Sequence, residues 1–171
     1  MKTSFSITLV LFLAVSVQAR EFKPNYEKKL GADLKELNFN FKSGQVQIRY
    51  DSDAKQSDVR CELQPNTAPK SEFTFEDRYK EFRCEITLSR ALKVTVKGED
   101  GQVQAENLIA ETNISLKNGQ LQFTSNSNVN YKFDASVENG MKPMLPMNAG
   151  KKTGKEVPVK LSVKNGMLSV Q

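Results

Sequence analysis

The sequence predicts an all-β protein, built as a short single-domain β-solenoid in which strand–glycine-turn–strand coils stack on one another. Apolar and polar residues alternate with period two through nearly every segment after residue 33, which is typical of strands with one buried face. No segment keeps a helical period over three turns. In the C-terminal half, the glycines of a recurring unit follow one another at a spacing of roughly 20 residues, which suits one solenoid coil.

The recurring unit reads apolar-x-apolar, lysine, a glycine turn, and then apolar-x-apolar again. Three copies match position by position, at Phe39 to Ile48, Ile114 to Phe123 and Leu161 to Val170. A fourth copy, Val94 to Ala105, has an expanded turn. The repeat indicates how the chain is built and carries little information about its chemistry.

Two architectures fit this unit. In a β-hairpin, Asn118-Gly119 forms a two-residue type I′ turn, for which Asn-Gly is favoured, and Leu116 faces Leu121. Hairpins of this kind build an antiparallel sandwich or barrel. In a solenoid, each glycine turn is the corner of a coil, and Leu116 stacks on neighbouring coils near Val96 and Val137.

The alternation places the strands in chain order. We expect them at Leu37 to Phe41, Val46 to Tyr50, Val59 to Leu63, Phe73 to Phe75, Phe82 to Leu88, Leu92 to Val96, Val103 to Leu108, Ile114 to Leu116, Leu121 to Phe123, Val129 to Val137, Val157 to Val163 and Met167 to Val170. The long breaks are Gln64 to Lys70 and Lys142 to Glu156. Residues 20–33 are polar and are expected to form an N-terminal arm or one helical turn, ahead of a single all-β domain at 34–171.

Residues 1–19 have the pattern of a secretory signal peptide. Lys2 precedes an apolar run from Ile7 to Val17, and Val17-Gln18-Ala19 places small residues at a cleavage site after Ala19. The run is shorter than the roughly 20 residues that span a bilayer, and no second run is long enough. The sequence therefore predicts a periplasmic or secreted protein with no transmembrane segment.

The two cysteines are predicted to pair. Cys61 and Cys84 each share the phase of the inward-facing apolar residues on their strands. Two inward-facing cysteines in an oxidising compartment most simply form one structural disulfide. A redox role would favour a close pair such as C-x-x-C, which is not present.

The inventory of reactive side chains predicts a protein that is not an enzyme and needs no cofactor. The chain has no histidine, which excludes Ser-His-Asp and Cys-His nucleophiles, histidine general bases and the usual zinc sites. The acidic clusters, Asp51, Asp53 and Asp58 and the pair Glu99 and Asp100, fall in turns, where solubility and turn geometry explain them. Charges of both signs are mixed along the chain. The most basic stretch, Lys151 to Lys155, lacks aromatic residues, so no nucleic-acid partner is expected.

Two features leave room for binding. Met141, Met144 and Met147 recur every third residue, and their soft thioethers would suit Cu(I) in a periplasmic metal-binding protein; the alternative is an apolar plug over an open edge. Glutamines occupy equivalent positions around the repeated turns, where they would form a hydrogen-bonding face for glycan or protein, or simply stabilise stacked strands. These glutamines are Gln45, Gln47, Gln102, Gln104, Gln120 and Gln122.

From Leu37 to the C-terminus, the chain resembles the putative-adhesin, toastrack-like β-solenoid domains of bacterial envelope proteins. Those domains open with strand, glycine turn and strand, as Leu37 to Tyr50 does, and later enter serial glycine-turn coils, as Leu92 to Val170 does. The resemblance implies an exported, non-enzymatic, adhesin-like solenoid that presents a surface to an envelope protein or glycan. It transfers no catalytic residue.

Two expectations concern the end of the repeat. The chain departs from the family pattern at Asn139 to Pro143, where proline replaces a returning strand. A final strand that ends at Val170 is expected to form an open edge that could recruit a second copy.

Overall fold

The computed structural model describes residues 21–64, 69–75, 82–141, 143, 145 and 155–171. The predicted signal peptide, and Met144 and Met147 of the methionine pattern, lie outside these residues. In the part of the chain that is described, no helix is long and apolar enough to cross a membrane.

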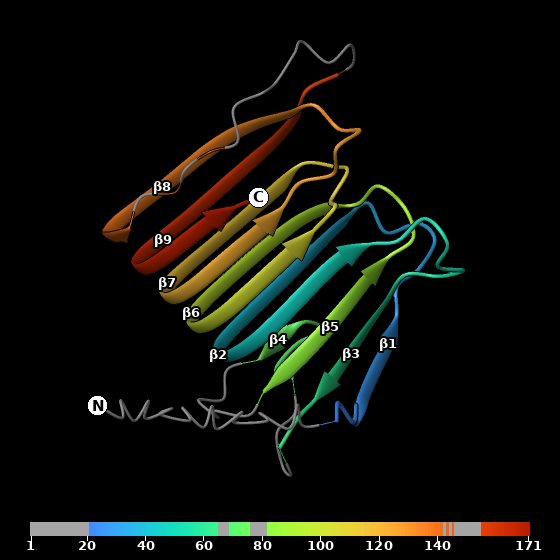
Figure 1. Ribbon diagram of the computed structural model, residues 1–171. Coiled ribbons are helices and arrows are strands. Elements are labelled where there is room, and N and C mark those ends of the chain that lie inside the picture. The colour runs from blue at the N-terminus through green and yellow to red at the C-terminus, as the bar shows by residue number, and fades with distance from the viewer. Residues whose placement is uncertain (1–20, 65–68, 76–81, 142, 144, 146–154) are drawn as a thin grey trace, which may run out of the picture.

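The described chain forms one open, nine-stranded sheet, which confirms the all-β prediction (Figure 1). The strands are β1 (Tyr26–Lys29), β2 (Glu36–Tyr50), β3 (Asp58–Glu62), β4 (Thr74–Phe75), β5 (Arg83–Leu88), β6 (Lys93–Glu106), β7 (Thr112–Thr124), β8 (Tyr131–Met141) and β9 (Val157–Val170). Their order across the sheet is β1-β3-β5-β2-β6-β7-β9-β8. The short strand β4 pairs with β2 before its glycine, and β5 pairs with β2 after it.

Most of the predicted strand pairs are single long strands that bend at a glycine. β2, β6, β7 and β9 each run through the bend, and both arms of each pair parallel and in register with the next strand of this set. Leu116 lies opposite Gly98 of β6 and Val163 of β9, and it does not pair with Leu121. The solenoid prediction is therefore confirmed and the hairpin alternative is wrong.

Glycine is required at the bends because the neighbouring backbones approach too closely for a side chain. At Gly119, φ is +129°, a conformation that L-residues rarely adopt. A Cβ there would lie 1.9 Å from the carbonyl oxygen of Gly101, and a Cβ at Gly166 would lie 1.9 Å from that of Gly119. A row of stacked glycines thus runs along the bends from Gly44 to Gly140.

The core lies inside the folded sheet, between the first arms (before the glycine) and the second arms (after it). Phe39, Ile114 and Leu161 on first arms and Ile48 and Phe123 on second arms are all fully buried. Period-two alternation places these side chains on the inner face of each arm.

The last two coils do not stack in chain order. β9 inserts between β7 and β8, so the glycines are ordered Gly119, Gly166, Gly140 instead of following the sequence. Buried apolar residues occupy both arms of β9, whereas the described strand β8 ends at Met141, one residue after its glycine. β7 covers both arms of β9, and β8 covers the first arm on the other side.

The open edge expected at the end of the chain is found at the second arm of β9, whereas the first arm is covered by β8. The first arm of β9 lies inside the sheet, and β8 forms the outer edge. Beyond Met167, the pairing partner of β9 within the described chain is β7 alone.

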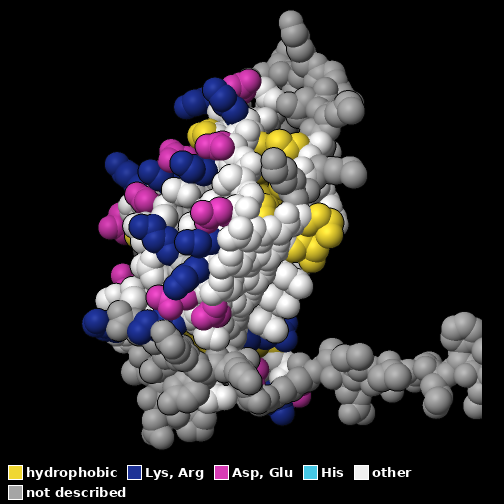
Figure 2. All heavy atoms as spheres, turned by 90° about the vertical axis from the view of Figure 1, so that its left-hand side faces the viewer, with side chains coloured by type: hydrophobic (Ala, Val, Ile, Leu, Met, Phe, Trp, Pro, Cys, Tyr) yellow, Lys and Arg dark blue, Asp and Glu magenta, His cyan; other side chains and the backbone are white. Residues whose placement is uncertain are grey.

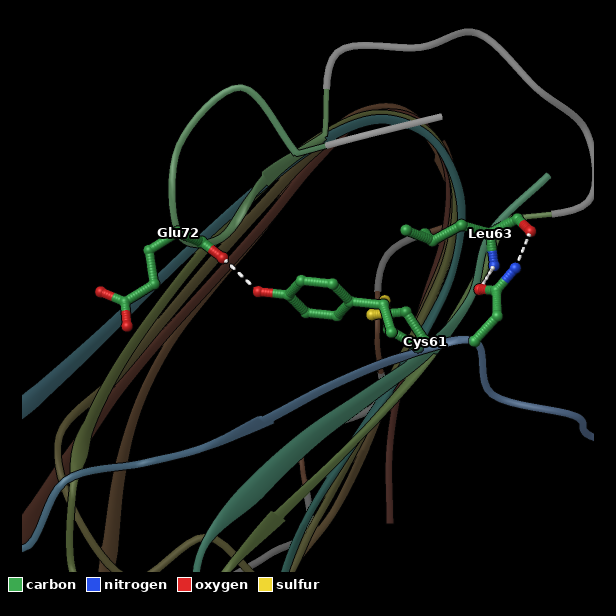
Figure 3. The surroundings of a disulfide bond; sticks show 6 residues. Cys61, Leu63 and Glu72 are labelled. Carbon is green, nitrogen blue, oxygen red and sulfur yellow. Dashed lines mark hydrogen bonds between the residues drawn. A yellow bond between two sulfur atoms is a disulfide. The ribbon is translucent and has the colours of Figure 1, made fainter. Parts of the chain in front are cut away.

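The segment expected to be an arm or a helical turn contributes a strand to the sheet. β1 pairs antiparallel with β3, and Asn25 exchanges hydrogen bonds of 2.7 and 2.8 Å with the backbone of Leu63. The Tyr26 hydroxyl donates to the Glu72 carbonyl at 2.9 Å (Figure 3). β1 is short and charged, as edge strands commonly are, so it lacks the alternation by which longer strands are predicted.

The predicted disulfide joins β3 to β5. Cys61 and Cys84 lie directly opposite each other in the antiparallel pair, with their Cα atoms 4.1 Å apart, and both are fully buried (Figure 3). The bond crosslinks two of the three outer strands, and β5 joins them to the solenoid by pairing with the second arm of β2.

Candidate binding surfaces

A trough crosses the outer face of the first arms at right angles to the strands. It has a volume of about 800 Å³ and takes three consecutive residues from each of five strands, together with two from β4. The residues are Asn40, Phe41, Lys42, Thr74, Phe75, Lys97, Gly98, Glu99, Ser115, Leu116, Lys117, Ser136, Val137, Glu138, Ser162, Val163 and Lys164. Six strands at about 4.8 Å spacing give the trough a length of roughly 24 Å.

The fold explains why the trough is continuous. Parallel, in-register pairing places equivalent residues of every coil in straight rows. One row runs from Asn40 through Lys97 to three serines, Ser115, Ser162 and Ser136. The second row, two residues further along each strand, holds charged side chains. The sequence repeat indicates these rows, but the position of β9 before β8 is needed to bring the three serines side by side.

The trough carries more positive than negative charge. Four lysines line it, Lys42, Lys97, Lys117 and Lys164, against the two glutamates Glu99 and Glu138. Lys164 and Glu138 are 3.9 Å apart and both are more than half exposed, so this ion pair is weak. Figure 2 shows mixed charges gathered along one side of the bends, beside a column of uncharged side chains and backbone.

A ladder of side-chain amides runs beside the glycines. Asn139 donates to Asn165 at 2.8 Å, Asn165 donates to Asn118 at 2.7 Å, and Asn118 donates to Asp100 at 2.6 Å. Asn165 and Asn118 thus each donate to one neighbouring strand and accept from the other, and Asn139 begins the ladder as a donor. This ladder gives Asp100 a structural role, and it accounts for asparagine before glycine without a type I′ turn.

The predicted glutamine face forms on the outer side of the second arms. Gln45, Gln102 and Gln120 lie in one row, and Gln47, Gln104 and Gln122 lie in the next. They border a shallow hollow of about 150 Å³. The hollow is smaller than the trough, and Arg83 is the one charged residue in its described lining. The trough is therefore the stronger candidate for a binding site.

Of the predicted methionine site, the structure describes Met141. Its side chain is 71% exposed, and in register beside it lies Met167, which is 41% exposed and was not part of the sequence pattern. Parallel pairing of β8 with β9 brings the two thioethers together. Among the residues described, no group of three or more Cys, Asp or Glu side chains is placed to hold a metal ion.

The pKa values of Tyr131 and Lys93 are both raised, for different reasons. Burial raises the pKa of the Tyr131 hydroxyl, which donates to the Leu108 carbonyl at 2.8 Å and closes the open side of the core. On the outer face, the Glu111 carboxylate, 3.2 Å from Lys93, raises the pKa of that ammonium, and Glu36 adds to the shift. Neither arrangement resembles an acid–base pair in a cleft.

Fold and surfaces together define a β-solenoid with an extended trough. No protein-family model and no curated protein matches the chain. Among solved structures, it is similar to a protein from Clostridium sporogenes described as a "putative cell adhesion protein", at 12% identity and a TM-score of 0.49, over 86% of this chain and 99% of the other.

Proposed function

We propose that this protein is an exported, non-enzymatic, adhesin-like binding module that holds an acidic polysaccharide chain along the trough. The observation that carries the proposal is the trough itself, in which five in-register strands set polar and charged side chains in two rows over roughly 19 Å. A linear polymer that lies across the strands meets polar or charged groups at each strand. A small ligand would use only a fraction of this length.

The charge of the trough supports an anionic ligand. Four lysines against two glutamates leave a net positive surface, and Lys97, Lys117 and Lys164 are exposed. Ammonium groups bind carboxylate or sulfate as point charges with rotatable donors. Ser115, Ser162 and Ser136 add hydroxyls that donate to and accept from the hydroxyl groups of a sugar chain.

The absence of exposed aromatic residues in the described trough argues for polysaccharide over nucleic acid. Proteins that bind single-stranded nucleic acid combine positive charge with aromatic side chains on which bases stack. Phe41 and Phe75 contribute to the lining, but they are only 4% and 2% exposed and belong to the core. The buried disulfide between Cys61 and Cys84 fits an oxidising compartment, where such polymers occur.

Titration calorimetry with polygalacturonate, dextran sulfate and neutral dextran tests the proposal. We expect binding to at least one of the two anionic polymers, weakening as salt rises, and none to dextran. Replacing both Lys117→Gln and Lys164→Gln should weaken binding by roughly tenfold, since two exposed charge contacts are worth about 0.7 kcal/mol each. The control pair Lys55→Gln and Lys155→Gln removes the same charge outside the trough and should bind like wild type. Absence of binding to both anionic polymers, or equal affinity of the two variants, would overturn the proposal.

Soft-metal binding is a second candidate, because Met141 lies in register beside Met167. Two neighbouring exposed thioethers suit Cu(I), and the predicted Met144 and Met147 follow in the chain. Titration with Cu(I) in ascorbate should give sub-micromolar affinity that Met167→Leu reduces at least tenfold. Affinity weaker than micromolar would eliminate this candidate.

A further inference from the structure

The outer edge of β8 is a long strand edge without a strand partner in the described chain. β8 spans 11 residues and pairs on one side with β9. Its inward-facing Phe133, Ala135 and Val137 are only partly buried, whereas Leu161 and Val163 beside them on β9 are 0% and 2% exposed. The apolar layer therefore continues to this edge and lacks a neighbour there.

The opposite edge of the sheet is protected. β1 has four residues, and Glu27, Lys28 and Lys29 are exposed on it. Short, charged edge strands resist pairing with another chain. β8, by contrast, is long and regular enough to accept another strand.

The sequence of β8 is self-complementary about Ala135. If two copies pair antiparallel around this residue, Phe133 lies opposite Val137 on the inner face, and Lys132 lies opposite Glu138 on the outer face. Each contact occurs twice, as a two-fold symmetric interface requires. Direct cross-strand pairs of apolar residues and of opposite charges are favourable.

Other registers are less favourable. A shift of the centre to Ser136 would place Asp134 opposite Glu138, a like-charge pair. A centre between two residues would set inward-facing side chains opposite outward-facing ones, which a continuous sheet does not allow. A centre at Phe133 would pair Lys132 with Asp134 but would join only residues 131–135 of each strand. Charge, alternation and the number of paired residues therefore favour the register centred on Ala135.

The opposite charges cannot satisfy each other within one copy. Lys132 and Glu138 are six residues apart on an extended strand, a separation of about 20 Å. Within the described part of the chain, Lys132 has no ion pair, and Glu138 has an ion pair of 3.9 Å with Lys164. Only a second copy brings Lys132 and Glu138 together.

We propose that two copies of this protein associate through antiparallel pairing of their β8 strands, centred on Ala135, so that their sheets join into one. The interface is small, and the dimer forms and dissociates with concentration. Joining two copies places two troughs in one particle, which raises the avidity for a polymer that carries many binding positions. The dimer itself does not depend on the identity of the trough's ligand.

Sedimentation equilibrium without ligand tests this pairing by charge reversal. Wild type should show a monomer–dimer equilibrium. Lys132→Glu and Glu138→Lys each convert two attractive pairs into two repulsive ones, and each should weaken association by about tenfold or more. The double reversal restores opposite charges across the interface and should bring the dissociation constant to within about threefold of wild type.

The control is Lys55→Glu, in the loop between β2 and β3, which changes the net charge by the same amount as Lys132→Glu and should associate like wild type. Thermal melting of each variant shows whether it is folded, including the double reversal, in which Lys164 gains a like-charged neighbour. A wild-type protein that stays monomeric, single reversals that dimerise normally, or a double reversal that stays monomeric would each overturn the proposal.

Discussion

Substituting Gly119 with alanine should destabilise the whole fold, because this glycine lies at the centre of the stacked bends. Its φ of +129° costs an L-residue about 1–3 kcal/mol. The added Cβ would lie 1.9 Å from the Gly101 carbonyl oxygen, so the backbones must separate, and overpacking of this kind costs about 1–3 kcal/mol or more. We therefore expect the free energy of unfolding to fall by about 3–5 kcal/mol, a large part of the roughly 5–15 kcal/mol of a typical domain.

Urea denaturation followed by circular dichroism measures this loss, with Gly31→Ala as the matched control. A Cβ at Gly31 would meet only the Asp33 carboxylate, at 2.7 Å, which is the far end of an exposed side chain, and its φ is not in the left-handed region. The control should change the free energy of unfolding by less than about 1 kcal/mol. If Gly119→Ala cost as little as Gly31→Ala, the bends would not be stacked as described.

Three further predictions concern the amide ladder, the disulfide and Tyr131. Asn165→Ala breaks two ladder hydrogen bonds and should lower the free energy of unfolding by about 1–2 kcal/mol in urea, whereas Asn139→Ala at the end of the ladder breaks one and should cost about half as much; equal costs would contradict the ladder. Replacing Cys61 and Cys84 together with alanine opens a loop of sequence separation 23 and should cost on the order of 3 kcal/mol by the same assay, and an unchanged midpoint would contradict a stabilising role. Because burial raises the pKa of Tyr131, the native state favours the protonated phenol; that stability is present below the ordinary tyrosine pKa of about 10 and is lost as pH rises through the native value. Tyr131→Phe should therefore cost about 1–3 kcal/mol at pH 7 and show a shallower loss of stability above pH 10 than wild type, and parallel pH profiles would contradict this.

Much of the fold can be predicted from local patterns. The alternation that begins at Leu37 locates the arms of every long strand, and the phase of Cys61 and Cys84 anticipates their disulfide. These features depend on which face of a strand is buried, a property that the sequence records residue by residue.

The order of the last coils could not be predicted in the same way. Nothing local to β9 shows that it inserts between β7 and β8, because parallel neighbours share the same apolar pattern. β1 was missed because four polar residues at an edge carry no alternation. The trough was missed because it exists only once rows from non-consecutive strands, such as Ser115 and Ser162, are side by side.

Methyl-resolved nuclear Overhauser spectroscopy tests the central structural claim most directly, by asking which residue lies beside Leu116. In the structure, Val163 is one strand away from Leu116, about 4.8 Å, and Val137 is two strands away, about 9.6 Å. We predict a strong Leu116–Val163 contact and none between Leu116 and Val137. A strong Leu116–Val137 contact would mean that the coils stack in chain order, and the serine row, the trough and the β8 edge would all have to be abandoned.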